Sequence, residues 1–106
     1  MIEFFFYSTK KKELKGFLVR GHANYSEKGS DIVCAGVSAI VEMCCNGICE
    51  VLKRDVIIEC EEGKIFLEIK EEDEMAKAFL RALELEVSLL QQQYKENISL
   101  KIMEEK

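Results

Sequence analysis

The chain has 106 residues, of which 48% are apolar and 33% charged, and its net charge is −5. This mixture is typical of one soluble globular domain, here over residues 1–106. The negative charge argues against direct binding of nucleic acid, which needs a basic face to neutralise phosphates. We expect no membrane partner and a cytoplasmic location, because no apolar run reaches the roughly 18 residues of a membrane span and the start lacks a signal-peptide pattern.

The first thirty residues predict a hairpin followed by a loop. Ile2–Ser8 and Leu14–Arg20 are rich in aromatic and branched residues, and the polar segment between them suits a turn. Residues 21–30 are polar and include two glycines, which indicates an irregular loop.

A long helix is predicted from Asp31 to about Leu52. Ser30 or Asp31 can cap it, because either side-chain oxygen can accept from free amides of the first turn. One line of apolar residues at helical spacing predicts the core-facing side: Val33, Val37, Ile40, Cys44, Ile48 and Val51. A more polar line starts at Cys34 and continues through Ser38, Glu42, Asn46 and Glu50.

The remainder predicts a second hairpin, a second helix and a last strand. Val56–Cys60 and Lys64–Lys70 alternate around a glycine-containing turn, and Ile98–Met103 alternates again. A helix is predicted from about Asp73 to Tyr94, with a buried line of Ala76, Phe79, Leu83, Val87, Leu90 and Tyr94.

The predicted order is ββαββαβ, an α/β fold of the α+β type in which two helices pack on one face of a mixed sheet. The opposite face keeps several apolar side chains: Phe5, Tyr7, Leu18, Ile57 and Phe66. Because a small monomer seldom leaves that much apolar surface in water, this pattern favours a homodimer.

His22 and Cys34 are the candidate catalytic residues. His22 is the only histidine and begins the loop, whereas Cys34 falls in the first turn of the predicted helix. A helix N-terminus and a nearby imidazolium both favour the thiolate form of a cysteine, which is a nucleophile. His22 would then protonate the leaving amine after the thiolate attacks a carbonyl. Spacing alone leaves open a plain turn histidine and a core cysteine.

The other polar and sulfur-containing residues have simpler alternatives. Asp31 is either a helix cap or a carboxylate that orients the imidazole, and Ser38 either lines a substrate groove or is a small helix residue. The remaining thiols, which lack C-x-x-C pairs and a second histidine, predict neither a metal site nor a cofactor. We expect all four to be small buried apolar side chains: Cys44, Cys45, Cys49 and Cys60.

Two joined motifs resemble the signature of the ribosomal-processing cysteine proteases, the Prp family. Gly21-His22-Ala23 matches its G-H-A segment, and residues 31–39, DIVCAGVSA, match its D-I-V-C-A-x-V-S-A segment. Weaker similarity follows at the turn 60–63 and at Gln93-Tyr94. The sequence departs from the family at Gly36, where alanine is common, and at Asn24, where glycine is usual.

The resemblance implies a homodimeric cysteine protease of small α/β fold, occupying the whole chain. Its substrate would be the N-terminal extension of ribosomal protein bL27, a basic protein that suits an acidic enzyme. By motif position, Cys34 is the nucleophile and His22 the general acid/base, while Gly21, Asp31 and Ser38 have substrate-binding or supporting roles. The loop 21–30 would close over an extended peptide.

A second hypothesis is a non-catalytic dimeric module that binds a ribosomal or ribosome-assembly protein through the loop 21–30. That hypothesis predicts an unreactive Cys34, whereas the protease hypothesis predicts that Cys34 alkylates faster than the other thiols. A thiol redox or metal-carrier role is disfavoured by the absence of C-x-x-C from the sequence.

Overall fold

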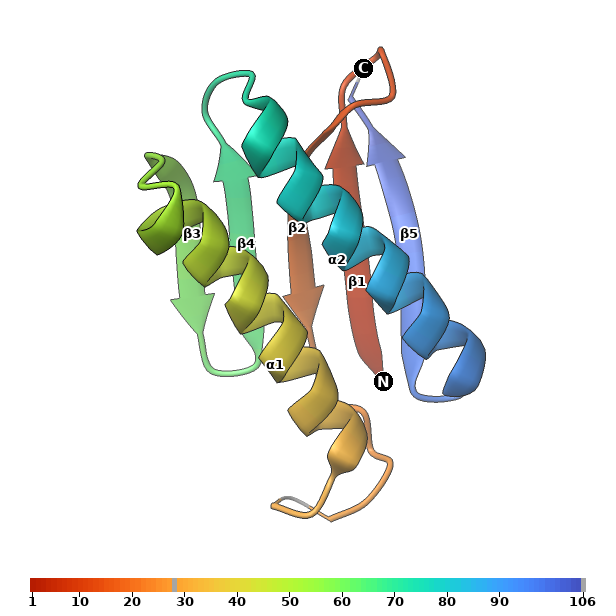
Figure 1. Ribbon diagram of the computed structural model, residues 1–106. Helices are drawn as coiled ribbons and strands as arrows, with labels where there is room; N and C mark the ends of the chain where they lie inside the picture. Colours follow the sequence, from red (N-terminus) through yellow and green to blue (C-terminus); the bar gives the residue numbers. More distant parts are fainter. Residues whose placement is uncertain (28, 106) are drawn as a thin grey trace.

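A computed structural model describes residues 1–27 and 29–105, which form a sheet covered by two helices (Figure 1). The elements in chain order are β1 (Ile2–Ser8), β2 (Leu14–Arg20), α1 (Ile32–Asn46), the π-helical turn η1 (Gly47–Val51), β3 (Val56–Glu61), β4 (Lys64–Ile69), α2 (Glu74–Gln93) and β5 (Ile98–Glu104). Both helices lie on the same face of the sheet (Figure 1). The predicted α+β fold and its element order are confirmed.

The strand order β3-β4-β2-β1-β5 brings the start of the first strand and three connections to one end of the sheet. β1 pairs antiparallel with β2 and parallel with β5, and β4 pairs antiparallel with both β2 and β3. The start of β1, the end of β2, the β3–β4 turn and the α2–β5 connection therefore meet at the end of the sheet where α1 begins (Figure 1).

Aromatic side chains form the centre of the core between the sheet and the helices. The rings of Phe4, Phe6 and Phe17 have centroids 5.7, 6.2 and 6.4 Å apart, and each side chain is 1% exposed or less. Such aromatic pairs contribute about 0.5–1.5 kcal/mol each beyond their buried area. The helices cover these rings with smaller apolar side chains: Val33, Val37, Val41, Cys44, Ile48, Ala76, Leu80, Leu83 and Val87.

The buried line of α1 differs from the prediction near its end. Val51 is 73% exposed, Ile40 is half-buried, and Val41 takes the core position at 1% exposed. The helix widens into η1, where the Leu52 amide donates to the Gly47 carbonyl at 2.9 Å. Because a π-helical turn has more residues than an α-helical turn, Val51 leaves the predicted line at the end of η1, whereas Ile48 stays on it and is fully buried.

Position 60 also differs from the prediction. Cys60 is exposed rather than buried, although it stands opposite Ile65 on the side of the sheet that carries the helices. β3 is an edge strand, and its apolar neighbour Ile58 is 42% exposed as well. The alternating pattern gives the correct face of the strand, but it does not show that the helices leave this edge uncovered.

The buried line of α2 is shifted in part. Ala76, Leu83 and Val87 are buried as predicted, whereas Leu80 is fully buried in place of the half-buried Phe79. Leu90 and Tyr94 are half-buried against the core. Lys77 is only 4% exposed, and its ammonium binds the carboxylates of Glu13 and Glu74, so the buried charge is compensated.

The helical segment Ile32–Val51 is long and apolar enough to cross a membrane by length and composition alone. The expectation that no segment reaches that length was therefore wrong. In the structure the buried side of this segment packs against the sheet, as in the core helix of a globular domain.

Candidate active site

Gly21 fixes the position of His22 at the end of β2. Its φ is +94°, and a Cβ there would lie 2.4 Å from the Met1 carbonyl oxygen, so only glycine fits. The Gly21 amide donates to the Gly63 carbonyl at 3.0 Å, which ties this bend to the β3–β4 turn. His22 Nε2 lies 3.6 Å from where a Gly63 Cβ would stand, so the imidazole rests against that turn.

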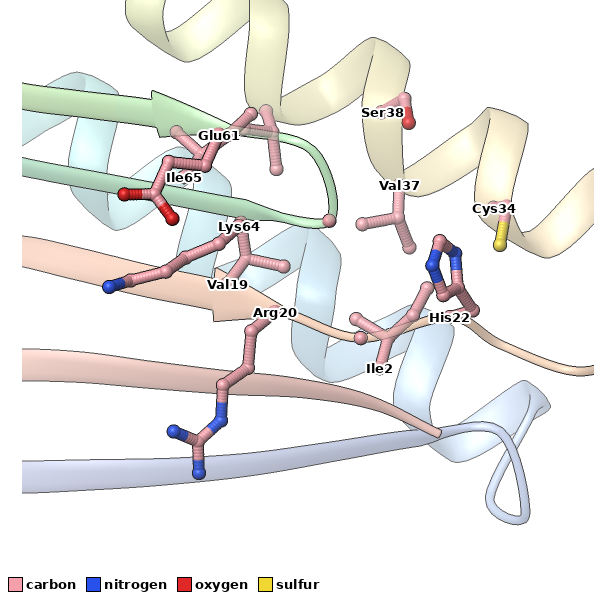
Figure 2. A pocket seen from close by; sticks show the side chains of 13 residues that line it. Ile2, Val19, Arg20, His22, Cys34, Val37, Ser38, Glu61, Lys64 and Ile65 are labelled. Carbon is pink, nitrogen blue, oxygen red and sulfur yellow. The ribbon is translucent and has the colours of Figure 1, made fainter.

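Cys34 lies in the first turn of α1, where its sulfur meets a backbone donor. The Ala23 amide donates to Cys34 Sγ at 3.3 Å, and the side chain is half-buried. His22 and Cys34 line the same two cavities. Figure 2 shows the first of these, with both side chains at its edge. The sulfur therefore has a backbone hydrogen-bond donor on one side and shares its cavities with an imidazole.

Asp31 joins the loop 21–30 to the start of α1. Its Oδ1 accepts from the Val33 and Cys34 amides at 3.0 Å each, and its Oδ2 accepts from the Tyr25 and Ser26 amides at 2.9 and 3.2 Å. Both oxygens are thus taken by backbone amides, which is the capping role rather than the imidazole-orienting one. Burial acts to raise the pKa of this carboxyl, but the four amides outweigh it and hold the pKa below its ordinary value.

The lowered pKa of Asp31 predicts a pH-dependent contribution to stability. A carboxyl whose pKa is lower in the folded state stabilises the fold at neutral pH, and this contribution is lost as pH falls through the folded-state pKa. We expect Asp31→Asn to lower the melting temperature by about 5 °C at neutral pH. The difference from wild type should shrink as the pH is lowered toward about 3, measured by circular dichroism.

Asp73→Asn is the matched control for that experiment. Asp73 caps α2 through the Met75 and Ala76 amides, and its pKa is also lowered, first by the Ala76 amide. Asp73→Asn should show the same kind of pH-dependent loss of stability, because it removes a capping carboxylate of the other helix. A difference that is constant from neutral pH to about pH 3 would contradict the assigned ionisation of Asp31.

The loop is also held from the side of the α2–β5 connection. The rings of Tyr25 and Tyr94 meet edge to face with centroids 5.5 Å apart. Asn24 has a φ of +57°, which explains why glycine suits this position and why asparagine is tolerated. The turn at Gly63 and Tyr94 were noted in the sequence only as weak similarities, yet both contact the segment that carries His22.

The two cavities on either side of the His22–Cys34 pair differ in chemistry. The first, about 210 Å³, has Ser38 at its edge and a mostly apolar wall of Ile2, Val19, Val37, Val41 and Ile65. The second, about 450 Å³, has more polar side chains in its lining, which includes Asn24, Ser26, Gly29, Asp31, Ala35 and Glu62. A chain bound at the sulfur would therefore meet branched aliphatic side chains in the first cavity and the side chains of the loop 21–30 in the second.

The remaining cysteines are chemically distinct from Cys34. Burial raises the pKa of Cys44 to about 12 and that of Cys45 to about 11, and it also raises the pKa of Cys49. Cys60 is exposed on the edge strand. Among residues 1–27 and 29–105, no three histidine, cysteine or acidic side chains are grouped as a metal site requires.

These environments predict an order of thiol reactivity. With iodoacetamide at neutral pH, we expect Cys34 to react first, Cys60 next, and Cys44 and Cys45 at least about 100-fold more slowly, because so little of each is thiolate. Peptide mass mapping over time measures each rate. Cys60→Ser should leave the rate at Cys34 unchanged, and equal rates at all five thiols would contradict the assigned environments.

A thiol in the first turn of a helix and an imidazole that lines the same cavities are the kinds of groups that acyl transfer by a cysteine hydrolase requires. The family model of the cysteine protease Prp matches residues 1–99. The chain therefore belongs to the Prp family of cysteine proteases.

Individual relatives agree in sequence and in fold. The ribosomal processing cysteine protease Prp of Bacillus subtilis (strain 168) is 27% identical over 94 residues, which cover 82% of this chain and 84% of that protein. The crystal structure of the S. aureus Prp with a covalently linked product peptide superposes with a TM-score of 0.91 at 25% identity, over 96% of this chain and 99% of that one. The crystal structure of SMU.848 from Streptococcus mutans superposes with a TM-score of 0.83 at 27% identity, over 99% of this chain and 96% of that one.

Proposed function

We propose that this protein is a cysteine endopeptidase in which Cys34 is the nucleophile and His22 the general acid/base. The sulfur bonds to the scissile carbonyl carbon, the C–N bond breaks, and the leaving amine takes a proton from His22. Water then cleaves the thioester while His22 accepts its proton and returns it to the sulfur. The observation that supports this assignment is the Ala23 amide donating to Cys34 Sγ in a space that His22 also lines.

The proposed substrate is the N-terminal extension of ribosomal protein bL27. The B. subtilis relative is named for ribosomal processing, and the S. aureus structure holds a product peptide. The net charge of −5 favours a basic protein substrate, and Glu61 and Glu62 each line one of the two cavities. In this proposal Gly21 sets the bend before His22, Asp31 fixes the loop, and Ser38 lines the substrate groove.

The direct experiment incubates bL27 carrying its extension with wild-type protein and follows the products by mass spectrometry. We expect one new N-terminus and a released extension peptide, with mature bL27 left uncut. Binding of bL27 without any cleavage would contradict the endopeptidase and support a binding module instead.

We also propose that the protein is a homodimer that pairs through the uncovered face of the sheet. Phe5, Tyr7, Leu18 and Phe66 lie on that face half-buried, and Ile57 is 45% exposed. Leu18 stands between Phe5 and Phe66 in the strand register, at the centre of this group. A surface of this kind is stabilised when a second copy covers it.

Sedimentation velocity tests the dimer with two identical substitutions. Leu18→Glu should give a monomer because it places a charge in the middle of the apolar face. Leu85→Glu, at a position 63% exposed on α2, should leave the dimer intact. A wild-type protein that sediments as a monomer at micromolar concentration, or a dimer unaffected by Leu18→Glu, would contradict this interface.

A further inference from the structure

The amide that donates to the candidate nucleophile belongs to a residue held by a distant part of the chain. Ala23 is 1% exposed, and its carbonyl accepts a hydrogen bond of 3.0 Å from Asn97 Nδ2. Asn97 lies 74 positions later, in the connection between α2 and β5. We propose that Asn97 is a positioning residue: by binding the Ala23 carbonyl it fixes the backbone of Ala23, so that the N–H of this residue, in the preceding peptide unit, stays directed at Cys34 Sγ.

Asn97 is itself fixed by the backbone around it. Its carbonyl accepts from the Ile2 amide at 2.8 Å, and its own amide donates to the Tyr94 carbonyl at 2.9 Å. The next residue, Ile98, is 1% exposed in the core. The side-chain amide therefore starts from a rigid base, which is the condition for positioning another group accurately.

The other contacts described for the loop act on residues before and after Ala23, not on Ala23 itself. Asp31 holds the Tyr25 and Ser26 amides, and the Tyr25 ring packs on Tyr94, so residues 25 and 26 are fixed beyond Ala23. Gly21 is tied to Gly63 on the near side. The hydrogen bond from Asn97 acts on Ala23 itself, between these two anchored points.

The effect of this N–H on reactivity depends on the Cys34 sulfur, which accepts its hydrogen bond. A neutral thiol is a weak acceptor, whereas a thiolate is a strong one, so a fixed N–H at the sulfur favours the reactive form. Without the Asn97 amide, the Ala23 carbonyl would lose its partner. The backbone dihedral angles of Ala23 would then be less restrained, and its N–H could turn away from the sulfur. This inference rests on the proposed role of Cys34 as nucleophile.

The test measures Cys34 alkylation in a Cys60→Ser background, with Asn97→Ala and with Asn97→Leu, which is close to asparagine in size. We expect the iodoacetamide rate at Cys34 to fall about tenfold at neutral pH in both variants. For cleavage of a bL27-extension peptide, kcat should fall similarly while KM changes less than about twofold. Asn46→Ala, at an asparagine without a capping hydrogen bond, should match the parent.

Several outcomes would overturn the inference. Unchanged alkylation in the folded Asn97 variants, or a rise in KM with kcat unchanged, would show that Asn97 does not act on the sulfur. Loss of cooperative unfolding in both variants would make it a folding residue instead. Alkylation needs no substrate, so it tests Asn97 independently of bL27. If the wild-type protein fails to cut bL27 but the Asn97 variants alkylate slowly, the proposed substrate is contradicted and the role of Asn97 is not.

Discussion

Cys34→Ala should reduce kcat/KM for bL27 cleavage by at least about 10⁴-fold, because removing the nucleophile leaves only binding and polar stabilisation of the transition state. The melting temperature should stay within a few degrees of wild type, since the side chain is half-buried and lies outside the fully buried line of α1. Peptide-cleavage kinetics and thermal unfolding on the same preparations measure both effects.

Cys60→Ala is the matched control for this substitution. Cys60 is a free, exposed cysteine that lines neither of the two cavities, so its loss should leave kcat/KM unchanged within about twofold. Activity that disappears in Cys60→Ala and persists in Cys34→Ala would move the nucleophile to the edge strand and refute the proposed site.

His22→Ala should lower kcat/KM by about 10³-fold, because proton transfer to the leaving amine and from water would then depend on solvent. The imidazole is exposed and rests on the Gly63 turn, so its removal should leave the fold intact. The same variant should slow the reaction of iodoacetamide with Cys34, since no imidazole would remain to take the thiol proton.

Asn24→Ala serves as the neighbouring control for His22→Ala. It changes a residue that lines the second cavity and has a left-handed backbone, so it tests general disturbance of the loop. We expect a raised KM with only a small change in kcat. A His22→Ala enzyme that keeps more than about a tenth of wild-type kcat would contradict general acid/base catalysis by this residue.

The sequence predicted the strands and helices well because each carries a local signal. Both helices begin after an aspartate that caps them, and β1 and β2 have the predicted bounds. The motifs also placed His22 and Cys34 on the right elements, at the end of a strand and in the first turn of a helix. These features depend on neighbouring residues, which a sequence pattern records directly.

The errors arose where distant segments decide the outcome. The exposure of Cys60 depends on how far the helices extend over the edge of the sheet. The burial of Lys77, for which no prediction was made from the sequence, depends on Glu13 in the β1–β2 connection. The contact between Asn97 and Ala23 joins positions 74 residues apart. Hydropathy and spacing carry no information on such pairs, so the support around the site required the structure.

The most direct measurement is the mapping of a covalent adduct formed by a peptide chloromethyl ketone that carries the bL27-extension sequence up to the cut. The account predicts one adduct per chain, attached to Cys34, absent from Cys34→Ala and formed more slowly by His22→Ala. An adduct on another cysteine, or full bL27 cleavage by a protein whose Cys34 is blocked, would contradict it.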